Sequence, residues 1–199
     1  STAAIGSISV TTLRDGERTL PPEALKNLSS EDAAKINSDD NQSLTFTNFN
    51  ACVIQNGTQN LLVDTGCGNL FGPTCGFILD ALDELDLTSD DITDIFITHL
   101  HPDHIGGCID EDSSAIFKNA SFKIIREEYN FWTSKEFGSD EINGTDWSSL
   151  AKKVLSAYDD RLEVLTGQID IISGVSTVPL PGHTPGHAGF RVDDGNRSM

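Results

Sequence analysis

The sequence is poor in basic residues and has no long apolar run. Its 199 residues include 13 Lys and Arg against 31 Asp and Glu, which gives a formal net charge of −18. A chain this acidic repels phosphate backbones and anionic lipid surfaces. No apolar run approaches the roughly 20 residues that span a bilayer. We therefore expect neither nucleic acid nor a membrane as a partner.

Cysteine is scarce as well, with four residues and no C-x-x-C pair. A structural zinc knuckle needs such pairs, so none is indicated. A chain of this size can bury a core without disulfides, and we expect free, buried thiols. No signal peptide is visible, and the first residue is Ser rather than Met. This start predicts an N-terminus that has been processed or trimmed.

Strand and helix patterns are mixed along the chain, which predicts an α/β fold with a mixed sheet. Asn56-Gly57 between two apolar runs is a strong hairpin signal. Apolar periodicity predicts helices over 24–36, 73–85, 126–132 and 146–157. Short strands are expected over 8–13, 92–98, 121–125, 162–165, 169–172, 175–180 and 189–192.

Histidine is also rare, but its five copies are not scattered. Three lie within residues 99–104, and the other two are His183 and His187. Both clusters follow a predicted strand, at loops where a ligand site is easily built. Isolated core or surface histidines would be spread along the chain, so this distribution indicates a metal site.

The spacing of these residues suggests which side chains share an ion. On an extended segment, His99 and His101 point to the same side and can bind one ion. Asp103 and His104 follow where the chain turns towards a helix and can address a second ion. His183, on a rigid Gly-His-Thr-Pro-Gly turn, can be a distant third ligand of the first ion. Such ligands suit zinc, with manganese or iron as alternatives.

With these motifs the sequence resembles the metallo-β-lactamase superfamily. The matching pieces are Val63-Asp64-Thr65-Gly66 and residues 99–107 and 181–187. Within the superfamily it is most similar to the methyl parathion hydrolase group and the related lactonases. That similarity lies in LLVDTGCGNLFGPTCG (61–76), in NASFKIIREEYNFW (119–132) and in the long spacer between the two histidine clusters.

The resemblance implies one domain over residues 1–199, a four-layer αβ/βα sandwich with mixed sheets and two divalent ions at one edge. By position, His99, His101 and His183 would bind the first ion, and Asp103 and His104 the second. Two further residues would support these ligands without binding metal, Asp64 and His187. For a lone Asp-Thr-Gly, a simple turn residue at a strand end is an equally good interpretation.

The family chemistry implied by this resemblance is hydrolysis by a hydroxide shared between two metal ions. Zinc lowers the pKa of bound water to about 7, so this nucleophile exists at neutral pH. The hydroxide would attack a carbonyl carbon or phosphorus, while Asp103 orients it or handles its proton. No serine nucleophile is needed, and no G-x-S-x-G motif is present.

Aromatic residues suggest the substrate class. Phe71 and Trp132 match positions that line the leaving-group pocket in the methyl parathion hydrolase group, and Phe137 is a third candidate. Ordinary packing explains each of them equally well. A pocket of this kind would take a small molecule with an apolar group, such as a lactone, an aryl ester or a phosphotriester. A thioester hydrolase of the glyoxalase II type and a β-lactamase are the alternative enzymes.

Two ligands of the family pattern have no counterpart here. Asp193 and Asp194 fall in a predicted hairpin turn, one strand too early for the bridging aspartate, and no histidine follows His187. We therefore expect a chain truncated before the second half of the fold is complete, or a complementing chain or homo-oligomer that supplies the rest. By itself, the chain could be a non-catalytic metal-binding fragment of a longer enzyme.

Overall fold

The computed structural model describes residues 1–19, 29, 31, 34, 46–134, 141–142 and 145–199. The helix predicted over 24–36 lies largely outside these residues. Within the described part, no helix has the length and apolar character needed to cross a bilayer. All four cysteines are free, as expected, and all but the half-buried Cys52 are buried.

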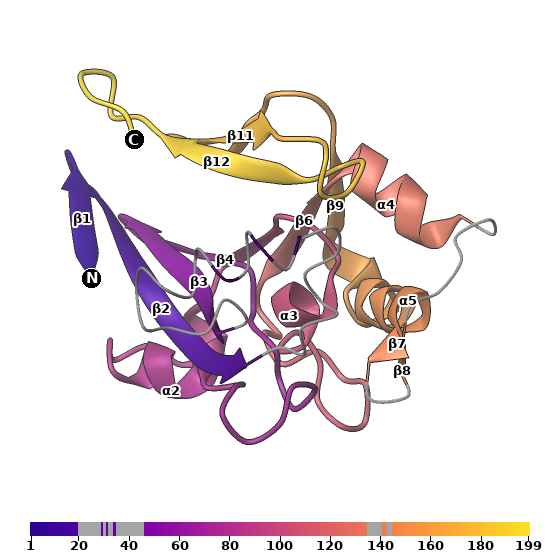
Figure 1. Ribbon diagram of the computed structural model, residues 1–199. Coiled ribbons are helices and arrows are strands. Elements are labelled where there is room, and N and C mark those ends of the chain that lie inside the picture. Colours follow the sequence, from indigo (N-terminus) through magenta and orange to yellow (C-terminus); the bar gives the residue numbers. More distant parts are fainter. Residues whose placement is uncertain (20–28, 30, 32–33, 35–45, 135–140, 143–144) are drawn as a thin grey trace.

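A mixed sheet of seven strands forms the centre of the described structure (Figure 1). In spatial order its strands are β1 (Thr2–Ile5), β2 (Ile8–Thr19), β3 (Phe46–Asn56), β4 (Gln59–Val63), β5 (Asp94–Ile97), β6 (Ser121–Ile125) and β9 (Leu162–Leu165). The first four strands pair antiparallel, whereas β4, β5, β6 and β9 are parallel. The predicted hairpin is confirmed, because Asn56 pairs with Gln59 across the turn.

A smaller antiparallel sheet contains β10 (Asp170–Ile172), β11 (Val175–Pro179) and β12 (Ala188–Val192). The short strands β7 (Glu141–Ile142) and β8 (Thr145–Asp146) pair with each other. The helices are α2 (Ile78–Asp83), α3 (Pro102–Ile105), α4 (Arg126–Thr133) and α5 (Trp147–Ala157), with 3₁₀ turns η2 (Ser89–Asp91) and η3 (Asp159–Arg161).

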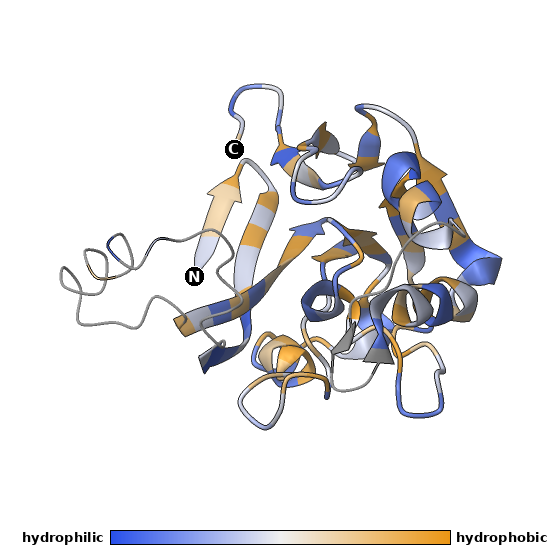
Figure 2. Cartoon of the chain, turned by 45° about the vertical axis from the view of Figure 1, so that its right-hand side comes forward, coloured by the Kyte–Doolittle hydropathy of each residue, from blue (hydrophilic) through white to orange (hydrophobic). Residues whose placement is uncertain are grey.

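Two apolar clusters cover opposite faces of the large sheet. Leu62 belongs to the cluster on the helix side, which includes Leu82 of α2 and Val154 of α5. Leu61 belongs to the cluster on the opposite face, which packs against the small sheet. Neighbouring strand residues point to opposite faces, which explains this division. The central strand β5 is buried along its whole length, as a parallel strand covered on both sides should be. Apolar and polar residues alternate along strands of both sheets (Figure 2).

The described elements therefore form three layers, namely helices, the large sheet and the small sheet. No described helix lies above β11 and β12 in Figure 1. The described residues thus provide three of the four layers that an αβ/βα sandwich would have. The α/β class with mixed sheets is confirmed.

The prediction that Pro73 opens a helix is wrong, because α2 begins only at Ile78. The intervening residues contact β2 instead of coiling. The amide of Glu17 donates to the carbonyl of Thr74 at 3.0 Å. Gly76 has φ 92°, a left-handed conformation that an α-helix excludes. A contact with a strand more than fifty residues earlier thus overrides the local apolar periodicity.

Candidate metal centre

Three loops meet at one edge of the two sheets. Because β4 and β5 are parallel, the segments after them emerge at the same edge. The amide of Thr65, after β4, donates to the carbonyl of His104 at 2.8 Å. The amide of Ala188, at the start of β12, donates to the carbonyl of Thr98 at 3.1 Å. These main-chain bonds hold the two histidine-bearing loops and the loop of Asp64 together.

His99, His101 and His183 converge at this edge. One ring nitrogen from each lies within 4.8 Å of the other two. Nε2 of His99 and Nδ1 of His101 are 3.1 Å apart. His99 is buried, His101 half-buried and His183 exposed, so the cluster reaches from the core to the surface. The structure thus brings together all three residues assigned to the first ion.

The first two histidines are held neutral by their surroundings. Burial lowers the pKa of His99, and the neighbouring histidines lower it further. Burial and His183 lower the pKa of His101 to about 4. The hydroxyl of Thr98 lies 2.9 Å from the Asp64 carboxylate, to which it donates, and 3.0 Å from Nδ1 of His99. That hydroxyl accepts the Nδ1 proton of His99, which leaves the lone pair on Nε2 facing His101.

This donor set fits a zinc-type ion. In a tetrahedral site with Zn–N bonds of about 2.0–2.1 Å, ligand nitrogens lie roughly 3.3 Å apart. The separation of 3.1 Å between His99 and His101 is close to this value. In the metal-free chain a proton on Nδ1 of His101 can bridge this contact, and in the other neutral tautomer both nitrogens offer a lone pair to a shared cation. The donor atom of His183 lies within 4.8 Å of both.

Asp103 and His104 lie beside this cluster in α3. Nε2 of His104 is 3.4 Å from the carboxylate of Asp103, and its Nδ1 is 2.7 Å from that of Asp64. Asp64 also accepts the amide of Thr98 at 2.8 Å. The predicted supporting residue therefore contacts His104 directly and fixes the direction of its ring.

The pKa values of Asp103 and His104 are shifted differently from those of His99 and His101. Burial by itself would lower the pKa of His104, but the carboxylates of Asp64 and Asp103 raise it to about 10. Burial opposes ionisation of Asp103, yet His104 holds the pKa of that carboxyl below its usual range. Without a metal, His104 therefore carries a proton at neutral pH.

The backbone beside these ligands is unusually constrained. Asp64 has φ 61°, a conformation that few residues other than glycine adopt. A Cβ on Gly106 would lie 2.1 Å from the carbonyl of Cys67, and one on Gly107 would lie 2.1 Å from the carbonyl of Thr65. Only glycine allows the loop after β4 to pack this closely behind α3.

His187 lies near the trio. Its ring centre is 4.9 Å from that of His99 and 5.7 Å from that of His183. The carboxylates of Asp193 and Asp194 instead bond to Arg191 and to amides of their own turn. Asp193 accepts the amide of Gly195, and Asp194 accepts the amides of residues 196 and 197.

The comparisons with known proteins agree with this geometry. The model of the metallo-beta-lactamase superfamily matches residues 44–199. The chain belongs to that superfamily. A search of curated proteins found no match.

Several solved structures resemble nearly the whole chain. AidC, a dizinc quorum-quenching lactonase in complex with a homoserine product, is 26% identical, with a TM-score of 0.83 over 100% of this chain and 71% of its own. The hydrolase AbOPH is 24% identical, with a TM-score of 0.82 over 99% of this chain and 70% of its own. An N-acyl homoserine lactone hydrolase with its product at the metal centre is 19% identical, with a TM-score of 0.64 over 95% and 72%. The latter two likenesses concern the fold.

The aromatic residues assigned to the substrate lie in different surroundings. Trp132 is 1% exposed, and its ring meets that of His101 edge-on at 5.6 Å. Phe71 is half-buried and packs against Phe49, with the Arg18 guanidinium over its ring. Phe137 lies outside the described residues. The sequence reasoning missed Trp147, whose ring lies 5.0 Å from that of His101.

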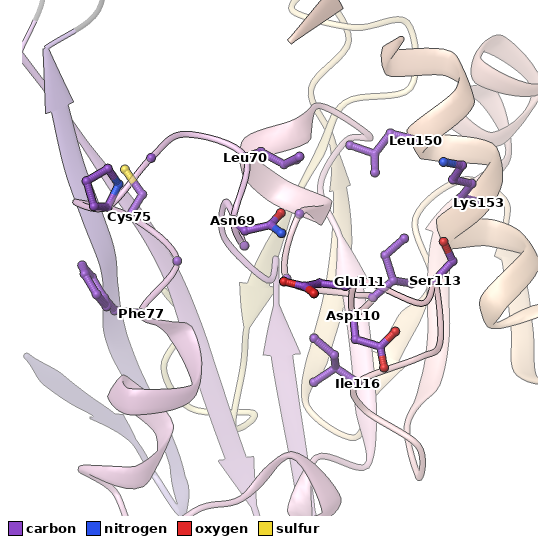
Figure 3. Close-up of a pocket in the computed structure, with 17 residues that line it drawn as sticks. Asn69, Leu70, Cys75, Phe77, Asp110, Glu111, Ser113, Ile116, Leu150 and Lys153 are labelled. Atoms are coloured by element: carbon purple, nitrogen blue, oxygen red, sulfur yellow. The ribbon is translucent and has the colours of Figure 1, made fainter. Parts of the chain in front are cut away.

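A broad pocket lies on another side of α3. It has a volume of about 750 Å³ and opens between the loop after β4, the loop after α3 and helix α5 (Figure 3). Its wall includes Leu70, Phe77, Asp110, Glu111, Leu150 and Lys153. No histidine is among the described residues that line it, and neither Phe71 nor Trp132 is. It is therefore separate from the metal centre.

Sequence reasoning also missed three polar residues that hold the ligands. Thr98 bonds to Asp64 and His99, and Glu128 and Thr184 bond to each other at 2.6 Å. Thr98 and Thr184 adjoin histidines in the chain, which was the available signal. Glu128 is one of 31 acidic residues, and nothing in its neighbourhood distinguishes it from the rest.

Proposed function

We propose that this metallo-β-lactamase chain carries the metal centre of a hydrolase that opens lactones or cleaves esters of small, apolar substrates. Phosphotriesters are a further substrate class of the same proposal. The observation that carries it is the convergence of His99, His101 and His183 beside Asp103 and His104. The relationship we propose is to the methyl parathion hydrolase group and its lactonases.

The similarity to AidC supports lactone hydrolysis in particular. AidC is described as a dizinc lactonase, and its structure contains an acyl-homoserine product. The likeness to it extends over this entire chain at 26% identity. A lactone and an aryl ester react through the same carbonyl chemistry, so one site can serve both.

The residues divide the work according to their charges. Two divalent ions, which we propose to be zinc with manganese or iron as alternatives, would supply Lewis acidity and a nucleophile at neutral pH. His99 and His101 would hold one of them as neutral donors together with His183, and Asp103 with His104 would contribute to the other. In this proposal the half-buried Asp103 carboxylate, 3.4 Å from Nε2 of His104, orients a water or accepts its proton. In this proposal Asp64 keeps the ring of His104 in position, and His187 supports the trio.

Aromatic side chains would bind the apolar part of the substrate. Phe71, Trp132 and Phe137 remain our proposed contacts, and we add Trp147 because its ring lies beside His101. An indole offers a large apolar surface with one polar group, which suits an acyl or aryl group next to a carbonyl.

The second ion needs more ligands than Asp103 and His104. No histidine follows His187, and the carboxylates of Asp193 and Asp194 accept hydrogen bonds from Arg191 and from amides of their own turn rather than facing the trio. We propose that the remaining ligands come from outside these 199 residues, from a longer polypeptide or from a second copy of the chain.

Turnover by the zinc-loaded protein with its complete ligand set, either the longer polypeptide or the assembly of two copies, tests the proposal. We expect hydrolysis of N-hexanoyl-homoserine lactone or an aryl ester, with paraoxon slower, and no hydrolysis by His101→Ala. Preferential turnover of a glutathione thioester or of nitrocefin would contradict it in favour of the alternative enzymes. Bound zinc without any turnover would support a non-catalytic metal-binding fragment instead.

A further inference from the structure

Glu128 is a buried acid with an unusual set of partners. It lies in the first turn of α4 and is 0% exposed. Its Oε1 accepts the amide of Leu100 at 2.9 Å and the indole Nε1–H of Trp132 at 2.6 Å. Its Oε2 accepts the hydroxyl of Thr184 at 2.6 Å and the amide of Gly186 at 3.1 Å. Each oxygen therefore receives two hydrogen bonds.

The partners of Glu128 belong to the two loops that carry the histidine trio. Leu100 stands between His99 and His101, and Thr184 follows His183 directly. One oxygen therefore bonds to the first ligand loop and the other oxygen to the second. A single side chain spans the two segments, which are more than eighty residues apart in sequence.

Packing around Glu128 leaves the second loop little freedom. A Cβ on Gly186 would lie 2.0 Å from the backbone nitrogen of Glu128, so this loop packs directly on the start of α4. The indole bonded to Glu128 also presses against a ligand, since the rings of Trp132 and His101 meet at 5.6 Å and 90°. The Glu128 carboxylate is thus connected to the trio through Leu100, through the loop of Thr184 and Gly186, and through Trp132.

A role confined to the helix itself does not explain this arrangement. An acid that only complements the positive end of a helix dipole can stay in solvent, as the neighbouring Glu127 does. Burying a carboxylate is costly unless every oxygen is hydrogen-bonded. At Glu128 that cost is met by donors from both ligand loops and from Trp132.

We propose that Glu128 is a positioning residue that holds the two ligand loops in register and thereby sets the metal affinity of the histidine trio. The inference rests on the proposed function only in requiring that His99, His101 and His183 bind an ion. Outer partners of metal ligands typically change affinity by about 10–100-fold when they are removed. The same range is expected here.

The test is a titration of the metal-free chain with cobalt(II), whose visible absorption reports the ligands around it. Glu128→Gln keeps the size of the side chain and one acceptor oxygen. If that oxygen stays with Leu100 and Trp132, the new NH₂ faces Gly186, whose amide is left without an acceptor. We expect binding about 10–100-fold weaker and a changed absorption spectrum.

Two further variants separate positioning from general stability. Thr184→Val removes one donor to Glu128 and should weaken cobalt binding several-fold, with a smaller effect once Glu128→Gln is present. Asp94→Asn is the matched control, since it also converts a buried carboxylate to an amide. Asp94 pairs with Lys123 at the opposite end of β5 from His99, so this variant should lower stability and leave cobalt binding unchanged.

The outcomes are distinguishable. A wild-type chain that does not bind cobalt through its histidines would refute the proposed function itself. Normal binding by wild type with equal affinity and spectrum for Glu128→Gln would overturn the role of Glu128. If Glu128→Gln does not fold, Thr184→Val decides, because unchanged cobalt affinity in that variant would overturn the proposal too. An equal loss in Asp94→Asn would mean that stability alone is being measured.

Discussion

The two halves of the metal centre differ in how far this chain prepares them. The trio of His99, His101 and His183 has three donors within 4.8 Å of one another. The second pair, Asp103 and His104, has two described side chains that contact each other at 3.4 Å. Burial lowers the pKa of His101 to about 4, whereas Asp64 and Asp103 overcome burial and raise that of His104 to about 10.

This difference shows how the same side chain can be prepared for two tasks. A neutral imidazole offers its lone pair at once, so His99 and His101 are ready for a cation at neutral pH. His104 must lose a proton before it can bind one, and its neighbouring carboxylates favour that proton until a metal replaces it. We therefore expect the trio to bind first and the pair to bind second.

The largest expected effect on cobalt affinity is that of His101→Ala. The matching change in the other half of the centre is Asp103→Ala. His101→Ala should weaken cobalt binding at the trio by at least about 100-fold, more than the loss of an outer partner. Asp103→Ala should leave that affinity within about threefold, since Asp103 contacts His104 and is neither a ligand of the trio nor an outer partner bonded to one of its rings. Cobalt titration followed by absorption measures both variants. Equal losses would mean that the two halves form one inseparable site.

A smaller effect is expected from Asp64→Asn, which removes the negative charge beside His104. Asparagine tolerates the φ of 61° at this position, so the change affects charge with little backbone strain. The metal-free chain should lose about 2 kcal/mol of unfolding free energy at pH 7, a typical value for a hydrogen bond between charged groups. Urea denaturation measures this loss, and NMR titration of His104 should show its pKa below the value of about 10.

The stability lost in Asp64→Asn should depend on pH, and its direction follows from the pKa of His104. The pKa of His104 is raised on folding, so its contribution is fully present below its unfolded value of 6.5. The contribution disappears as the pH rises through about 10. The stabilities of the wild type and of Asp64→Asn should therefore converge at high pH. A difference that stays constant up to that pH would contradict the assignment of charge to His104.

The smallest expected effect is on the acid side, and it concerns the trio. The pKa of His101 is lowered on folding, so the metal-free chain should lose stability as the pH falls from 6.5 through about 4. We expect this residue to contribute about 1 kcal/mol over the first pH unit below 6.5, since one pKa unit corresponds to about 1.4 kcal/mol. The difference between urea unfolding of wild type and of His101→Asn over this range isolates it. Equal slopes for the two proteins would show that folding does not lower the pKa of His101.

Much of the fold follows from local pattern. The bounds predicted for β6 and β9 agree with the structure, because each is a short run rich in apolar residues and bounded by turn or polar residues. The start of α2 was wrong, because residues before Ile78 bond to β2. Such long-range contacts leave no local trace in the sequence.

In the candidate site, too, some features could be predicted from the sequence and others could not. The positions of His99 and His183 in two loops could be predicted, since ligand spacing and strand ends are local features. The bonds of Glu128 could not, because its partners come from segments 28 and 56 residues away. Trp147 was missed for the same reason, since it reaches His101 only through the packing of α5.

The sequence by itself determined the chemistry, that is, which nitrogen and oxygen donors are available and which strands deliver them to one edge. Tertiary structure alone decided their charge states and their alignment. His101 and His104 stand three residues apart, yet one is held neutral and the other protonated. The physical reason is that burial and neighbouring carboxylates set a pKa, and both depend on residues brought close only by folding.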